Sequence, residues 1–486
     1  MADQQDSPDP TGPVQVLVVG FGAAGASAAI TARRLGASVL VLEKQAVAAH
    51  TPSTRMSGGL IMGMTDADAG ARYLDLCAGG MIPGAVSAAW ARRAVEMRDW
   101  LEELAPELEL SAIGGAEQRD LDGAEAVTVL QPGGSDARLD TSSGAGRAVY
   151  DALTAAARRH DVEVRWEAVV RRLTRAADGR VDGVELVSGE RITAGAVVLT
   201  CGGFEFDEAM KQDYLRVFPV HFYGNPGNTG DGIRMAQDVG ADLWHMNQMI
   251  GRAIARFDLP GGTPMGFIIN IAPPGYLITD RYGRRFADET PQAELLHGFY
   301  YELLTFDHHR GEYPRVPCYW FFDERRRRAG PLTHPHLGAC AVGLYEWSPD
   351  NSKEIAAGWI HGGDTIEEAA RAAGIADPEA AARSVRGYNA TCEAGFDPLG
   401  RPGPSLIPLD EPPYYCVPLW PGGSNTSGGP RRDEHARVLD VFGEPIAGLF
   451  AAGELGQPVG LRYPADGSNL TEAMCFGQIA AEEAVK

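Results

Sequence analysis

Residues 14–43 constrain the fold more than any other stretch, because VQVLVVGFGAAGASAAITARRLGASVLVLE predicts a strand, a glycine turn, a helix and a second strand. The run VQVLVV is apolar and β-branched, as in a strand buried on both faces. Gly20, Gly22 and Gly25 follow with G-x-G-x-x-G spacing. The first glycine permits a tight turn, the second lets backbone approach a pyrophosphate, and the third lets the helix pack closely. Glu43 ends the second strand, where an acid binds the hydroxyl pair of a ribose.

This βαβ unit predicts a dinucleotide site. The helix over residues 23–35 directs its N-terminal N–H groups at the phosphates. The acid at position 43 disfavours the 2′-phosphate of NADP, but the motif leaves NAD and FAD open. The alternative is a glycine-rich packing turn without a ligand, and the complete order of strand, turn, helix and acid disfavours it.

Composition narrows the class of protein. A chain of 486 residues exceeds one ordinary core, so we expect two domains. The net charge of −22 disfavours nucleic acid and anionic membrane surfaces as partners. The seven cysteines are scattered, without C-x-x-C spacing, so no iron–sulfur, c-haem or zinc motif is recognisable and no metal site is predicted. Unclustered cysteines are typical of reduced thiols, and we expect a cytoplasmic protein.

The N-terminal segment carries two further expectations. Residues 1–13 are acidic and proline-rich, which predicts a short disordered lead with no visible export signal. The apolar stretch over residues 13–32 is long enough to suggest a membrane span. Its glycine turn and β-branched first third make a buried βα unit the better interpretation, so no membrane span is predicted.

The rest of the chain divides by composition and periodicity. Helical spacing covers residues 88–104 and 148–159, and an alternating β-meander follows from about 163 to 200. Aromatic residues, proline and histidine become dense over residues 244–423, which we interpret as an inserted cap domain with two capped helices. Nucleotide-domain character returns at 424 and ends in a final helix. The sequence thus predicts one domain from 14–243 with 424–486, and a cap from 244–423.

Several motifs together resemble one family. Gly20-x-Gly22-x-x-Gly25, Ser57-Gly58-Gly59, CGGFEF, GNTGDGIRMA, GRRFADE, NTSGG, LFAAGE and the last helix are similar, in this order, to the fumarate-reductase/succinate-dehydrogenase flavoprotein superfamily, which includes the 3-ketosteroid dehydrogenases. The resemblance implies an α/β fold: a Rossmann-like FAD-binding domain built from both chain ends, with an inserted α+β cap. It implies non-covalent FAD and an active site between the two domains. His50 is an alternative, covalent anchor. The residues expected to bind FAD are Gly20, Gly22, Ala24, Gly25, Glu43, Lys44, Ser57, Gly58, Gly59, Val169, Gly202, Gly203, Asp231, Gly453, Glu454, Ser468, Asn469 and Leu470.

The fumarate-reductase branch of that superfamily fits poorly. Ala293 occupies the position at which those enzymes have a proton-donating arginine. Asn425 and Ile250 occupy the positions at which they have the histidines of two substrate-handling motifs. A small dicarboxylate bound without these groups would be poorly compensated. Fumarate and succinate are therefore not the expected substrates.

The ketosteroid branch fits better before the last helix. Its Tyr-Pro-x-x-Gly loop is similar to residues 463–467, where Tyr463 and the N–H of Gly467 would hold a ketone oxygen. Enolisation places charge on that oxygen, and two donors stabilise it. The alternatives are that Tyr463 only packs beneath the flavin, or that Arg462 serves instead with an acidic substrate.

The proton-abstracting tyrosine of that branch has no match at its usual place, and Tyr300 and Tyr301 are the nearest candidates.

The resemblance implies an oxidoreductase that moves a hydride between flavin N5 and a C–C bond next to a carbonyl. The expected substrate is an apolar cyclic ketone or enone, with an unknown electron acceptor. The alternatives are an ene-reductase of enones or enoates, and a flavin-binding or electron-transfer partner protein without this chemistry.

Overall fold

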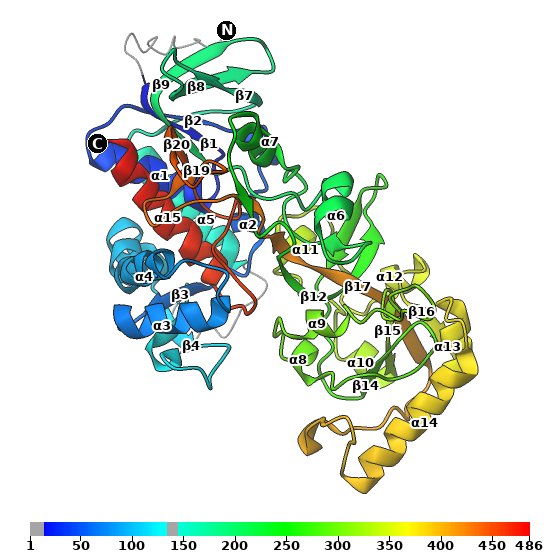
Figure 1. Ribbon diagram of the computed structural model, residues 1–486. Coiled ribbons are helices and arrows are strands. Elements are labelled where there is room, and N and C mark those ends of the chain that lie inside the picture. The colour runs from blue at the N-terminus through cyan, green and yellow to red at the C-terminus, as the bar shows by residue number, and fades with distance from the viewer. Residues whose placement is uncertain (1–13, 134–143) are drawn as a thin grey trace.

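The computed structural model describes residues 14–133 and 144–486, so the predicted lead over residues 1–13 lies outside the described residues. In the part of the chain that the structure describes, the strands form an eight-stranded sheet, a seven-stranded sheet and two smaller ones. Figure 1 shows that the first and last helices build one half of the molecule, while the green and yellow middle of the chain builds the other. This mixed architecture agrees with the predicted α/β class with an α+β insert.

The eight-stranded sheet is centred on β1, Val14–Val19, which is the strand predicted at the start of the glycine motif. β1 lies parallel between β2, Val39–Leu42, and β9, Arg191–Leu199. The next strand outward is β20, Pro445–Ala451, also parallel to β9, and β6, Glu163–Arg165, extends the sheet beyond β2. Strands from both ends of the sequence therefore share one sheet.

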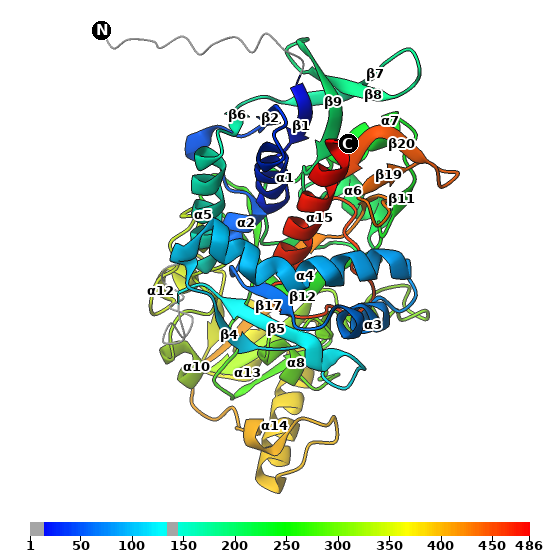
Figure 2. The same cartoon turned by 90° about the vertical axis from the view of Figure 1, so that its left-hand side faces the viewer.

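Successive residues of β1 face opposite sides of this sheet, because side chains alternate along a strand. Val16 and Val18 belong to a core with the helices, whereas Leu17 and Val19 belong to the core on the other side. The helix side holds α1, Ala23–Arg34, and α15, Ser468–Ala484, which lie side by side in Figure 2. The other face is covered by α7, Asp231–Asp238, and by the meander β7, Val170–Arg175, β8, Val181–Leu186, and β9.

The segment between β2 and the meander is helical, as predicted, but it also contains strands that the sequence analysis did not predict. The helices are α2, Ser53–Met56, α3, Ala67–Ala78, α4, Gly84–Leu104, and α5, Ala145–Arg159. The strands are β3, Ile61–Met64, β4, Ser111–Gly114, and β5, Val127–Gln131, which form the three-stranded sheet.

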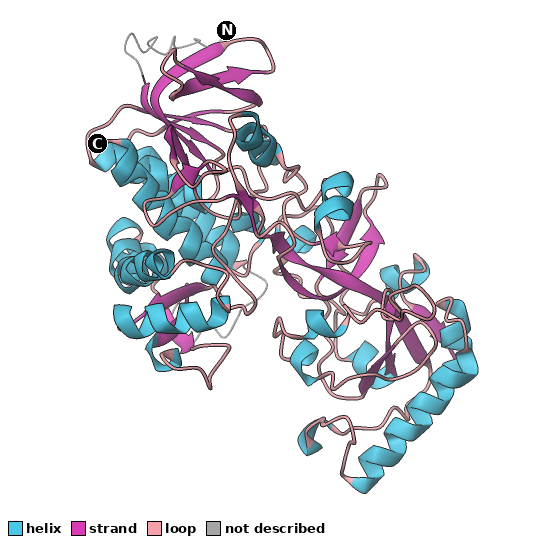
Figure 3. Cartoon of the chain, viewed as in Figure 1, coloured by secondary structure: helices cyan, strands magenta, loops and turns pink. Residues whose placement is uncertain are grey.

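The seven-stranded sheet occupies the other half of the molecule (Figure 3). Its centre is β17, a long strand over Tyr414–Thr426, between β12, Met249–Asp258, and β15, Cys318–Asp323. The other strands are β10, His221–Phe222, β13, Pro264–Phe267, β14, Tyr276–Thr279, and β16, His361–Gly363. β10 precedes residue 244 but pairs with β17, and the boundaries between the two domains stay a prediction.

The two helices predicted for the cap are present. α13, Ile366–Ala372, begins with a capping box formed by Thr365 and Glu368, and α14, Pro378–Ala394, is capped by the side chain of Asp377. The remaining elements are short: α6, Glu208–Tyr214, α8, Thr290–Ala293, α9, Phe299–Glu302, α10, Glu324–Arg328, α11, Gly338–Ala341, α12, Ser352–Ala356, β11, Leu243–Trp244, β18, Gly429–Pro430, and β19, Arg437–Leu439.

A buried ion pair ties the return of the chain to its last helix. Arg432, directly after β18, lies 2.5 Å from Glu472 in α15, and both side chains are fully buried. The same guanidinium donates to the carbonyl oxygens of Ala451, Gly453 and Gly456 at 2.9–3.2 Å. Arg432 therefore fixes the loop after β20 against α15.

Replacing Arg432 should destabilise the fold strongly. Arg432→Leu leaves the Glu472 carboxyl buried without its partner, and losing one member of a buried pair costs about 3–5 kcal/mol of the free energy of unfolding. Arg34→Leu, which breaks an exposed pair with Glu103, is the control and should cost about 0–1 kcal/mol. Urea unfolding of both variants measures the difference. Equal losses would show that Arg432 does not hold this loop.

Candidate functional site

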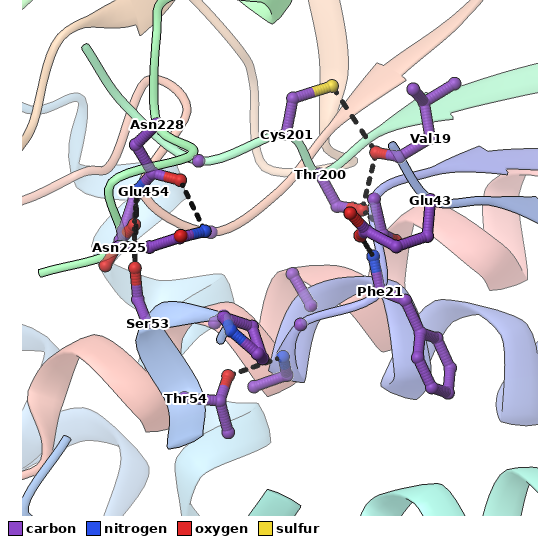
Figure 4. A pocket seen from close by; sticks show the side chains of 18 of the residues that line it. Val19, Phe21, Glu43, Ser53, Thr54, Thr200, Cys201, Asn225, Asn228 and Glu454 are labelled. Atoms are coloured by element: carbon purple, nitrogen blue, oxygen red, sulfur yellow. Dashed lines mark hydrogen bonds between the residues drawn. The ribbon is translucent and has the colours of Figure 1, made fainter. Parts of the chain in front are cut away.

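A pocket of about 1170 Å³, including its open mouth, lies at the carboxyl ends of β1, β2 and β9. This is where open α/β sheets bind ligands. Figure 4 shows two polar groups facing each other across it, with Glu43 on one side and Asn228 and Glu454 on the other. Of the residues expected to bind FAD, those that line the pocket are Gly20, Gly22, Ala24, Glu43, Lys44, Ser57, Val169, Gly202, Asp231, Gly453, Glu454, Asn469 and Leu470.

The glycine turn leaves space where a phosphate would approach. Gly22 is the N-cap of α1 and supplies no side-chain cap. A Cβ at this position would meet nothing closer than the Thr54 hydroxyl at 3.5 Å. Gly25 is different, because a Cβ there would lie 2.0 Å from the carbonyl oxygen of Gly20. The second glycine therefore borders open space and the third permits close packing, as the motif predicts.

Glu43 is held at one end of the pocket. Its carboxylate accepts hydrogen bonds from the backbone N–H groups of Phe21 and Gln45, both at 2.9 Å. Burial opposes ionisation, but His50 and these N–H groups lower the pKa of Glu43 below its usual range. An ionised acid beside the glycine turn is well suited to accept hydrogen bonds from the two ribose hydroxyls.

The His50 ring lies at the same end of the pocket. One ring nitrogen is 2.7 Å from the Tyr150 hydroxyl, and the other is 3.4 Å from the Glu43 carboxylate. The ring is 2 % exposed and contacts Phe21 and Trp166. Both nitrogens thus have partners at the Glu43 end of the pocket, which favours the non-covalent alternative for the flavin.

The opposite side of the pocket carries a pair of buried acids. Glu454 accepts hydrogen bonds from Ser53 and Asn228, both at 3.0 Å. Burial, followed by the charge of neighbouring Glu205, raises the pKa of Glu454 well above its usual range. Burial therefore favours the neutral acid, which is a form that can donate a hydrogen bond. Lys44 lies nearby and pairs with Asp231 at 2.6 Å.

Five of the residues expected to bind FAD do not line the pocket but support it: Gly25, Gly58, Gly59, Gly203 and Ser468. A Cβ at Gly59 would lie 2.1 Å from the backbone of Ala145, and one at Gly203 would lie 2.2 Å from the Thr426 hydroxyl. Gly58 faces Leu337 of the cap, and the Ser468 hydroxyl donates to the carbonyl of Ala465 at 2.7 Å. Their direct contact with FAD stays a prediction.

Tyr463 lies in the loop before α15, beside the pocket. Its hydroxyl oxygen accepts a hydrogen bond from the backbone N–H of Asn469 at 3.2 Å. Its ring packs on His297, with ring centroids 4.2 Å apart. Burial raises the pKa of Tyr463 well above its usual range, so the hydroxyl stays protonated. Among the described residues nothing accepts that proton, which is therefore available to a ligand.

Gly467 is the N-cap of α15 and has a φ of +86°. A Cβ there would lie 2.6 Å from the backbone of Leu60 and Ile61, so only glycine fits. Its N–H has no acceptor in the described part of the chain. Tyr463 and Gly467 thus present two free donors from one loop.

The other candidates for catalysis lie elsewhere. Tyr300 is 3 % exposed and packs against Gly251, where a Cβ would lie 2.7 Å from its ring. Tyr301 is 38 % exposed and donates to the carbonyl of Leu461 at 2.5 Å. Arg462 is exposed, and its backbone N–H donates to Cys77. None of the three lines the pocket. Tyr463 and Gly467 do not line it either, but Asn469, whose N–H bonds to the Tyr463 hydroxyl, does.

Other residues beside Tyr463 went unnoticed in the sequence. Tyr223 follows β10 and lines the pocket, and it lies near enough to Tyr463 to influence its ionisation. Arg252 of β12 and Glu117 both contact His297. The sequence signal that could have identified one of them is Arg252, a charged residue within the largely apolar run of β12. The other residues lie in loops, which have no periodic pattern.

Comparison with known proteins gives a consistent result. A family model described as an FAD binding domain matches residues 15–470. The chain is 31% identical to 4-oxocyclohexanecarboxylate 2-dehydrogenase of Sinomonas cyclohexanicum, over 97% of this chain and 92% of that one. It is 32% identical to 3-oxosteroid 1-dehydrogenase of Mycobacterium tuberculosis, over 59% of this chain and 52% of that one. The crystal structure of 3-ketosteroid Δ1-dehydrogenase from Sterolibacterium denitrificans has a similar fold, with a TM-score of 0.82, 24% identity and coverage of 98% and 100%.

Substitution of Gly22 tests the pocket as the FAD site. Gly22→Val should yield folded, colourless protein, because its Cβ makes only ordinary contacts with Thr54 and Pro52 while the branched side chain takes the space that the pyrophosphate needs. The matched control is Gly387→Val in α14, where a Cβ has nothing within 4 Å, and it should remain yellow. Visible absorbance and circular dichroism report cofactor and fold. A yellow Gly22→Val protein would show that FAD binds elsewhere.

Acid precipitation of the wild-type protein tests the mode of attachment. We expect free FAD in the supernatant, because both His50 nitrogens already contact Tyr150 and Glu43. Yellow colour that stays in the pellet, and that His50→Ala releases, would establish a covalent bond instead.

Proposed function

This chain belongs to the FAD binding domain family and is an FAD-dependent oxidoreductase acting on CH–CH groups, and we propose that it dehydrogenates a cyclic ketone beside its carbonyl. The observation that carries the proposal is the Tyr463 hydroxyl, which accepts from the N–H of Asn469 and keeps its own proton free. The relatives named as dehydrogenases of a 4-oxocyclohexane acid and of 3-oxosteroids support the same substrate class.

Tyr463 and Gly467 form the proposed oxyanion site. When the α-proton leaves a ketone, negative charge develops on the carbonyl oxygen, and two aligned donors stabilise it. The N–H of Asn469 withdraws charge from the Tyr463 oxygen and makes its proton a better donor. FAD supplies the acceptor for the hydride that leaves the neighbouring carbon.

Tyr223, as its phenolate, is our candidate to receive the α-proton and become the phenol, in place of Tyr300 and Tyr301. It lines the FAD pocket, is 8 % exposed, and lies near Tyr463. Tyr300 packs behind β12, and the hydroxyl of Tyr301 already donates to a backbone carbonyl. Of the three, Tyr223 has the placement that proton transfer at the pocket requires.

Reduction of a small dicarboxylate is the less favoured alternative. Ile250 and Ala293 pack in apolar cores. Asn425 is fully buried and bonds to Gln457 and Asn469 at 3.1 and 2.8 Å, so its amide has no group free for a carboxylate.

We also propose a cytoplasmic location, because the seven cysteines are unpaired. Among the described helices, none is both long and apolar enough to cross a bilayer.

Flavin absorbance under anaerobic conditions distinguishes the possible activities. Bleaching by cyclic ketones is the expected result, while fumarate and succinate should change the flavin in neither direction. Reoxidation of the reduced enzyme by enones, with no bleaching by ketones, would favour an ene-reductase. No reaction with any of these compounds would favour an electron-transfer protein and contradict the proposal.

Tyr463→Phe should slow flavin reduction while leaving the fold and bound FAD intact, because only the hydroxyl is lost. Loss of one oxyanion donor costs about 10²–10³ in kcat, on the order of 3 kcal/mol. Tyr300→Phe is the matched control, since its buried hydroxyl has no partner, and it should reduce at the wild-type rate. Single-turnover reduction by a reactive cyclic ketone measures both. A wild-type rate in Tyr463→Phe would leave this tyrosine with a packing role only.

A further inference from the structure

We propose that the cyclic ketone carries a carboxylate and that Arg252 binds it. This inference rests on the proposed function, which it deepens by naming a second functional group on the substrate. It departs from the apolar substrate that the sequence predicts. Arg252 is a buried cation that the described part of the fold leaves largely unpaired.

Arg252 lies on β12, paired with Gly422 of β17, and is 5 % exposed. A guanidinium has five N–H donors. Among the described residues it makes one hydrogen bond, from Nη2 to the Nε2 atom of His297 at 2.7 Å. Its Nε is buried without any partner in the described structure. A buried charge with most of its donors unused is costly unless a ligand completes it.

His297 fixes the orientation of this guanidinium. Its Nδ1 donates to Glu117 at 2.9 Å, and its backbone N–H donates to the same carboxylate at 3.0 Å. Burial, followed by the charge of Arg252, lowers the pKa of His297, so the ring is neutral and its Nε2 accepts from the arginine. Glu117 is near enough for Arg252 to lower its pKa, but among the described residues Arg252 forms no ion pair, because Glu117 contacts the histidine instead.

Arg252 and the proposed oxyanion site share His297 as a neighbour. The His297 ring that accepts from the Arg252 guanidinium also packs on the ring of Tyr463. Ile254 shares the Arg252 face of β12, because side chains two apart on a strand point the same way. It forms a small apolar cluster with Tyr223 and Ile268, and Tyr223 lines the FAD pocket. An oxyanion site, an apolar surface and an unpaired cation thus occur together.

Two histidines strengthen the polar character of this region. His334 and His336 each bury one ring nitrogen without a partner, and their rings are 5.5 Å apart. Burial is the main cause that lowers the pKa of His334, and Arg252 is close enough to add to the shift. The loop that carries them continues into Leu337, which packs on the same apolar cluster.

A carboxylate matches these groups better than a neutral substituent does. A planar carboxylate accepts two parallel hydrogen bonds from a guanidinium, and such charge-assisted pairs are roughly twice as strong as neutral ones. A cyclic ketone that also carries a carboxylate would engage Tyr463 through its ketone oxygen and Arg252 through its carboxylate. Arg462, the arginine suggested by the sequence for an acidic substrate, is exposed, whereas Arg252 is buried.

The test compares an acid with its neutral analogue on the holoenzyme. The probes are 4-oxocyclohexanecarboxylate and 4-oxocyclohexanecarboxamide, followed by anaerobic flavin reduction. Wild type should prefer the acid by about 10²-fold in kcat/KM, mainly through KM, because the amide lacks the negative charge and the second acceptor oxygen that pair with a guanidinium. Arg252→Gln should lose that preference, while Arg252→Lys should retain part of it.

Arg256→Gln is the matched control, because Arg256 lies on the same strand and pairs with Asp258. It should retain the wild-type preference for the acid. A second measurement needs no turnover: titration of the holoenzyme with cyclohexanecarboxylate and cyclohexanecarboxamide, followed by the shift of the flavin spectrum. Tighter binding of the acid by wild type, lost in Arg252→Gln, supports the carboxylate site even if Arg252→Gln reacts poorly with both ketones.

The outcomes separate this inference from the proposed function. Equal reaction of wild type with both ketones would overturn the carboxylate site and leave the ketone dehydrogenase standing. An unchanged acid preference in Arg252→Gln would overturn the role of Arg252. Failure of both ketones to reduce the flavin, together with tighter binding of cyclohexanecarboxylate through Arg252, would contradict the proposed reaction and keep the anion site.

Discussion

The close approach of helix α1 to the strands beneath it is the constraint on which the site depends. A Cβ at Gly25 would lie 2.0 Å from one carbonyl oxygen and 2.8 Å from the Thr200 hydroxyl, so no other residue lets the helix descend this far. That position brings the first turn of α1 to the ends of β1 and β9, where its N–H groups face the pocket. Glu43 then lies near enough to accept from the N–H of Phe21. The dinucleotide site is thus a consequence of how closely a helix can pack on a sheet.

The second half of the site comes from contacts between the two halves of the molecule. The end of β17 brings Thr426 against Glu205. The Glu205 carboxylate accepts hydrogen bonds from the backbone N–H and from the hydroxyl of Thr426. Asn425, one residue earlier, bonds to Asn469 at the start of α15. The Glu117–His297 contact joins the two halves again beside Tyr463. The residues proposed for the reaction therefore gather where the seven-stranded sheet meets the FAD-binding half.

The sequence predicted those parts of the fold that depend on interactions between residues close together along the chain. Period-two alternation, glycine spacing and caps at Thr365 and Asp377 depend on neighbours a few residues away, and the corresponding strands, turn and helices are present. The strands β4 and β5 were missed because they are short and lie between long helices. Tyr300 and Tyr301 were chosen by their spacing from a motif in the sequence. Such spacing does not determine how the intervening loop folds, so it cannot predict that Tyr300 packs against β12. Arg252 and His297 meet only through folding, because 45 residues separate them along the chain.

One strand has a consequence for how the protein loses its structure. β17 pairs along its length with strands of the cap, yet its last residues bond to Glu205, Gln457 and Asn469 of the other half. Neither half can melt without releasing an end of this strand. The chain should therefore behave as a single cooperative unit on heating, with one calorimetric transition rather than two, although its sheets are built from separate stretches of sequence.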